Sequence, residues 1–99
     1  MELKALLGEA LATRKPIRRE FDFSGQTVVA HFLDLPALEV REILRGPEAE
    51  RDARLIAATL CDETGAALLT FEQAQQLRLA YLQVLLEQAL SVIGALQEG

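Results

Sequence analysis

The sequence is poor in the residues that most enzyme and metal sites need. It contains one cysteine, one histidine and no tryptophan among 99 residues. A single cysteine excludes an intrachain disulfide and a multi-cysteine zinc site. The glycines do not cluster as they do in phosphate-binding loops, and no Gly-x-Ser-x-Gly motif is present. We therefore expect no catalytic residue, no cofactor and no metal site.

The few side chains that could carry chemistry have simpler structural interpretations. His31 stands in mid-strand beside Phe32 and is expected on a strand face. Cys61 has apolar neighbours, so we interpret it as a small buried side chain rather than a nucleophile. Asp62 and Glu63 are adjacent carboxylates in a predicted turn that lacks the alternating ligands of a calcium loop.

Basic charge is also scarce. The 15 acidic and 10 basic residues give a net charge of −5, whereas a nucleic-acid binder normally carries a basic surplus. Four of the basic residues, Arg14, Lys15, Arg18 and Arg19, lie close together. We interpret that cluster as a solvated turn leading into an edge strand, with a site for an acidic partner as the alternative.

No segment has the features of a membrane span or an export signal. The apolar stretch Leu79 to Leu86 is far too short to cross a bilayer. The first eleven residues mix charges with apolar residues, which is unlike a secretory signal peptide. We expect an intracellular protein that binds neither nucleic acid nor membrane.

The apolar content is enough for one small core with some surface left over. Hydrophobic residues make up 51% of the chain and charged residues 25%. The length is close to the common size of a domain. We therefore predict a helix-rich α+β single domain over 1–99, with an N-terminal helix and β-hairpin in 1–33 and a helical part in 34–99.

Periodicity and turn residues place the predicted elements. Helical spacing predicts a short helix over 2–13, and a period of two with a central turn predicts a β-hairpin over 17–33. Asp34 is the expected cap of the next helix, which Gly46 closes, and Pro47 opens another.

The apolar run 55–61 fits a helix or a strand, and the capping residues favour a helix. A tight turn at 62–65 and a short extended piece at 66–69 follow. Thr70 and Gln73 then form a capping box for a long final helix to about residue 96, with a bend near 78–81.

This final helix is unusually apolar. At about 100° per residue, its apolar side chains cover an arc of about 220°, roughly twice what a surface helix needs. The helix is therefore either the central element of the core or a surface shared with a client or a second copy of the chain. The residues assigned to a partner-binding face are Leu79, Tyr81, Leu82, Leu85, Leu86, Ala89, Leu90 and Ile93.

One segment resembles a known family. The sequence RLIAATLCDETG at 54–65, followed by LLTFE at 68–72 and an apolar helix, is similar to the tail assembly chaperones of long-tailed bacteriophages and their prophage relatives. A β-rich part before the helices is usual in that family, and the predicted hairpin at 17–33 matches it. Ala66 and Ala67 depart from the pattern, because the family more often has polar or proline residues there.

The resemblance implies a non-enzymatic role. Such proteins coat the aggregation-prone tape measure protein until the tail tube polymerises around it, so the expected partners are the tape measure protein and also the tail tube protein. It further implies a location in the cytoplasm of the bacterial host and absence from the mature virion. The rival interpretations are a structural tail or head–tail joining protein, and a small acidic secretion-type chaperone or adaptor acting as a dimer.

Overall fold

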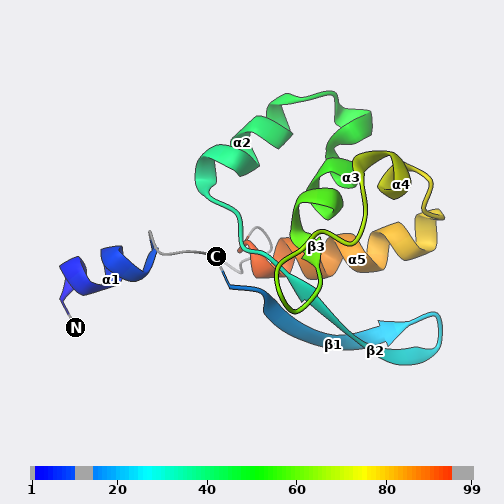
Figure 1. The fold of residues 1–99 in the computed structure, drawn as a ribbon. Coiled ribbons are helices and arrows are strands. Elements are labelled where there is room, and N and C mark those ends of the chain that lie inside the picture. The colour runs from blue at the N-terminus through cyan, green and yellow to red at the C-terminus, as the bar shows by residue number, and fades with distance from the viewer. Residues whose placement is uncertain (1, 11–14, 95–99) are drawn as a thin grey trace.

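The chain forms an N-terminal helix, a β-hairpin and then a helical part that packs on the hairpin (Figure 1). The computed structural model describes residues 2–10 and 15–94. The predicted α+β class with one hairpin is confirmed. In chain order the elements are α1 (Leu3–Ala10), β1 (Ile17–Phe23), β2 (Gln26–Phe32), α2 (Ala37–Arg45), α3 (Glu48–Thr59), β3 (Leu60–Cys61), α4 (Phe71–Gln75) and α5 (Leu79–Val92).

The hairpin forms where the alternating pattern predicts it. Strands β1 and β2 pair antiparallel from Ile17 opposite Phe32 to Phe23 opposite Gln26. Ser24 and Gly25 make the turn with positive φ angles of 56° and 82°, as a type I′ turn requires. Residues of β1 alternate between half-buried and exposed, so one face of the hairpin packs on the helices.

Helices α2 and α3 start at prolines rather than at a capping side chain. Pro36 and Pro47 occupy the N-cap positions, and neither makes a side-chain capping hydrogen bond. The predicted cap at Asp34 is therefore wrong, because the extended backbone at Pro36 delays the helix beyond the reach of that carboxylate. Gly46 ends α2 as predicted, and its N–H donates to the Ile43 carbonyl over 3.1 Å.

The ambiguous run 55–61 divides between the two expected structures. It is helical up to Thr59, and Leu60 and Cys61 then form β3, the third strand of the antiparallel sheet. Phe32 lies opposite Leu60 in this pairing, and the Leu33 N–H donates to the Thr59 carbonyl over 2.8 Å. The end of α3 is thereby joined to the end of the hairpin.

The final helix, predicted over 71 to about 96 with a bend near 78–81, is interrupted just before the expected bend rather than bent. Helix α4 ends at Gln75, and α5 begins only at Leu79. Gln76 retains a helical backbone, whereas Arg78 is extended at φ −63° and ψ 145°. The half-buried Leu77 between them packs against the core, which pulls the chain out of the helical path. Residues 95 and 96 lie outside the described part of the chain.

The core lies where α5 passes between the helices and the hairpin (Figure 1). Helix α5 packs against α3 on one side and β1 on the other, and α3 also packs against α2 and α4. The central buried residues are Phe32, Ala53, Ile56, Leu60, Ala74, Leu85, Ala89 and Val92. Helix α1 lies apart from this body (Figure 1), within the predicted range 2–13, of which 11–13 are not described.

Candidate protein-binding surface

Two of the eight residues of the predicted partner-binding face belong to the core of the fold. Leu85 and Ala89 are only 7% and 0% exposed. Both lie on α5, whose neighbours α3 and β1 cover them. These two residues are therefore closed to a partner while the chain is folded, which corrects that part of the predicted face.

The other predicted residues lie at the margins of the core. Leu82 and Leu86 are half-buried and pack against the core cluster. Leu90 and Ile93 are also half-buried, whereas Leu79 at the start of α5 is 66% exposed. Contact of these residues with a partner stays a prediction, and Leu79 is the residue among them with the most free surface.

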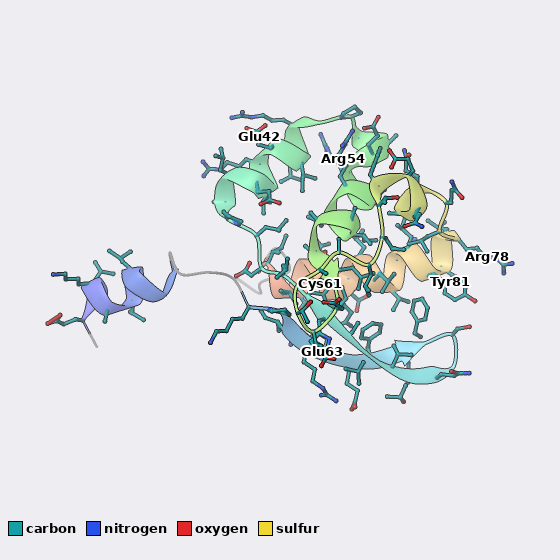
Figure 2. The ribbon with its side chains drawn as sticks, viewed as in Figure 1. Glu42, Arg54, Cys61, Glu63, Arg78 and Tyr81 are labelled. Carbon is teal, nitrogen blue, oxygen red and sulfur yellow. The ribbon has the colours of Figure 1, made fainter. Side chains whose placement is uncertain are left out.

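Tyr81 has a clear structural role. Its ring centroid lies 5.0 Å from that of Phe23, and its hydroxyl is 3.1 Å from the Oγ of Ser24. Figure 2 shows Tyr81 on the side of α5 that faces the hairpin. The contact fixes the tip of the hairpin to the start of α5.

The largest exposed apolar side chains belong mainly to helices other than α5. Of eight large apolar side chains that are exposed in the described part of the chain, three lie on α1 and two on α2. Helix α2 is fully described and has no buried residue. The five residues are Leu3, Leu6 and Leu7 on α1 and Leu38 and Leu44 on α2. Contiguous exposed apolar surface is typical of sites that bind other proteins, and these two helices carry most of the exposed large apolar side chains.

The exposure of Leu38 has a signal in the sequence that our interpretation missed. At about 100° per residue, Leu38 lies about 160° from Val40 around α2. One helix cannot bury both side chains against the same neighbour. Leu38 is 67% exposed, while Val40 is half-buried. The helical angles alone therefore mark Leu38 as the residue that points away from Val40, but they do not show that the Val40 side of α2 is only half covered.

A groove of about 340 Å³ lies between α2, α3 and the start of α4. We call it the α2–α4 groove. Its apolar lining is Ile43, Ala57, Ala58 and Phe71, and its charged lining is Glu39, Glu42 and Arg54. None of these side chains was assigned to a site from the sequence, because the groove exists only once three helices have met.

The charges of this groove are separated by element. The Arg54 guanidinium lies 4.1 Å from the ring centroid of Phe71 and donates to the Glu50 carboxylate over 2.6 Å. Glu39 and Glu42 come from the opposite helix, α2 (Figure 2 labels Glu42 and Arg54). Glu42 forms no ion pair with the residues that the structure describes. The groove thus has an acidic edge on α2, whereas the cation on its α3 edge is already paired with Glu50 and stacked on Phe71.

A second pocket, of about 440 Å³, opens between the start of α2 and the end of α5. Leu35, Val40 and Ile93 supply its apolar lining, with Asp34 and Arg41 as its charged residues. Ile93 is the member of the predicted partner-binding face that lines this pocket.

The turn at 62–65 is built by the carboxylate of Asp62. Its Oδ1 accepts hydrogen bonds from the Thr64 hydroxyl, the Thr64 N–H and the Ala66 N–H at 2.6, 2.8 and 3.0 Å. The hydrogen bond from the Thr64 side chain is the main cause that lowers the pKa of Asp62, and the backbone donors add to it. Gly65 has a φ of 94°, which favours glycine. This geometry is that of a structural turn.

The remaining residues singled out from the sequence also occupy structural positions. Cys61 is buried as predicted, and burial followed by the nearby Asp62 charge raises the pKa of its thiol. A raised pKa opposes formation of the reactive thiolate. His31 is half-buried on β2 and lies opposite Cys61 in the sheet.

The basic cluster is not a convergent site among its described members. Arg18 is exposed and lies 3.6 Å from the Glu20 carboxylate. Arg19 points to the half-buried side of β1, where its Nε is buried without a hydrogen-bond partner in the described structure. Arg14 lies outside the described residues.

Comparison of the chain with known protein families, with curated proteins and with solved structures finds no match. In 2–10 and 15–94, no helix combines the length and the apolar character needed to cross a membrane. The fold and its surfaces therefore define a small α+β protein with exposed apolar helices.

Proposed function

We propose that this chain is a protein-binding chaperone. In particular, we propose a phage or prophage tail assembly chaperone that binds the tape measure protein in the host cytoplasm and keeps it soluble during tail assembly. The resemblance of 54–72 to that family supplies the identity of the client. The exposed apolar surface of the helices supplies the physical means.

One observation carries the proposal: leucines on α2 and at the start of α5 are left exposed by a fold that has already built its core. Leu38 and Leu79 are each at least 66% exposed. Apolar surface can cover an apolar face of a client helix, as in helix-in-groove recognition. The net charge of −5 favours solubility of a protein that exposes such surface.

Co-expression tests the proposal directly. The soluble fraction of the tape measure protein is measured with and without this chain. We expect a large increase in its presence. A double variant, Leu38→Ser with Leu44→Ser, should reduce that increase without unfolding the chain, because both side chains are more than half exposed. Leu68→Ser is the matched control, since Leu68 is 53% exposed but lies outside the helices.

Two results would contradict the proposal. If the tape measure protein is equally insoluble with and without the chain, the chaperone function is wrong. If the chain is found in stoichiometric amounts in purified virions, the rival function as a structural tail or head–tail joining protein is favoured instead.

A further inference from the structure

Helix α1 has an apolar stripe that the described part of its own chain leaves uncovered. It has eight residues, and isolated helices shorter than about 12–15 residues are marginal in water. Gly8 lies in its interior and weakens it further. Nevertheless Leu3, Leu6 and Leu7 are 68%, 43% and 51% exposed. A short helix with an uncovered apolar stripe is expected to gain its stability by docking.

Lys4 of α1 lies beside that stripe. At about 100° per residue from Leu3, the other two leucines fall within about 60° of it, and Lys4 lies at about 100° on one flank. Glu2 directly precedes the helix, and its carbonyl accepts a hydrogen bond from the Leu6 N–H over 3.3 Å. A surface that fits α1 should therefore be apolar in the middle and acidic along the edge that meets Lys4.

The α2–α4 groove has this arrangement. Its floor includes Ile43 and Ala57, and Glu42 stands on the α2 edge. Arg54 on the α3 edge is already engaged, because its guanidinium pairs with Glu50 and lies over the Phe71 ring. Attraction between Lys4 and Glu42 would orient a docked α1.

The place of α1 in the fold favours a groove on another molecule. Helix α1 lies apart from α2, α3 and α4 of its own chain, so it does not occupy its own α2–α4 groove (Figure 1). A second copy of the chain can present this groove to α1.

We propose that the chain forms a homodimer in which α1 of each copy docks in the α2–α4 groove of the other. The three leucines of α1 cover Ile43 and Ala57, and Lys4 faces Glu42. The exchange is reciprocal, so one two-fold axis closes the assembly. This proposal does not depend on the chaperone function, because its test requires no client.

Analytical ultracentrifugation of the full chain over a range of concentrations tests the proposal. The wild type should show a monomer–dimer equilibrium. Leu6→Ser and Leu7→Ser should each raise the dimer Kd by about tenfold or more, since each removes an apolar side chain buried on docking. Both side chains are exposed in the single chain, so the unfolding midpoint of the monomer should not change.

A charge exchange tests the assigned groove. Lys4→Glu and Glu42→Lys should each raise the dimer Kd by about three- to tenfold, because each places like charges together. The double variant should restore a Kd near that of the wild type, since it re-creates the pair with reversed signs.

Three outcomes would overturn the proposal. The first is a wild type that stays monomeric up to millimolar concentration, including a monomer in which α1 docks on the body of its own chain. The second is a dimer whose Kd the leucine substitutions leave unchanged. The third is a pair of charge variants whose effects simply add, because additive effects mean that Lys4 and Glu42 do not meet.

Discussion

Individual leucines on α5 differ sharply in how much they contribute to the stability of the fold, although they look alike in the sequence. Leu85 is 7% exposed in the core, whereas Leu79 is 66% exposed on the same helix. We expect Leu85→Ala to lower the free energy of unfolding by about 2–5 kcal/mol, because it leaves a cavity. Leu79→Ala should change it by no more than about 0.5 kcal/mol. Urea denaturation of both variants measures the contrast, and equal losses would contradict the burial described above.

Asp62 gives the turn at 62–65 a pH dependence. Its pKa is lowered in the folded chain, mainly by the Thr64 hydroxyl. The stability that it contributes is present above the unfolded-state pKa of 3.8 and is lost as the pH falls through the lower folded-state pKa. Thr64→Val should therefore move the Asp62 pKa up towards 3.8. A carboxyl NMR titration of wild type and variant measures this shift, and coincident titration curves would show that the hydroxyl is not the cause.

At the scale of elements, α4 and α5 begin in different ways. Thr70 caps α4 through a complete capping box with Gln73, whereas Arg78 at the start of α5 makes no side-chain capping hydrogen bond. Thr70→Ala should lower the free energy of unfolding by about 0.5–2 kcal/mol. Arg78→Ser should raise it by about 0.5–1 kcal/mol, because serine can cap the exposed N–H groups. Thermal unfolding measures both. A destabilised Arg78→Ser variant would mean that Arg78 has another role.

The same two helices show how far the sequence predicts the fold. The hairpin and the capping box depend on neighbouring residues, and both are confirmed. The sequence predicts only a bend near 78–81, because the interruption at 76–78 contains neither glycine nor proline. It arises because Leu77 packs against a core that distant segments build. Strand β3 forms for a related reason, since Leu60 and Cys61 pair with β2 after their helix has ended.

The candidate surface was harder to predict than the fold. The apolar arc of the last helix indicated which residues avoid water, but not what covers them. Leu85 and Ala89 are covered within the chain, and Leu38 and Leu44 of α2 are exposed instead. Burial of a helix face depends on which other elements pack against it, and α2 packs mainly against α3.

At the scale of the whole molecule, α1 should be dispensable for folding of the body. It lies apart from the other elements (Figure 1), and its described side chains are exposed. Deletion of residues 2–10 should therefore change the free energy of unfolding by no more than about 0.5 kcal/mol at low protein concentration. Above the dimer Kd, the full chain should become more stable with concentration by mass action, whereas the deleted chain should not. Chemical denaturation at several concentrations measures both effects. If the deletion lowers the free energy of unfolding strongly at low protein concentration, α1 stabilises its own chain, and reciprocal docking would then be wrong.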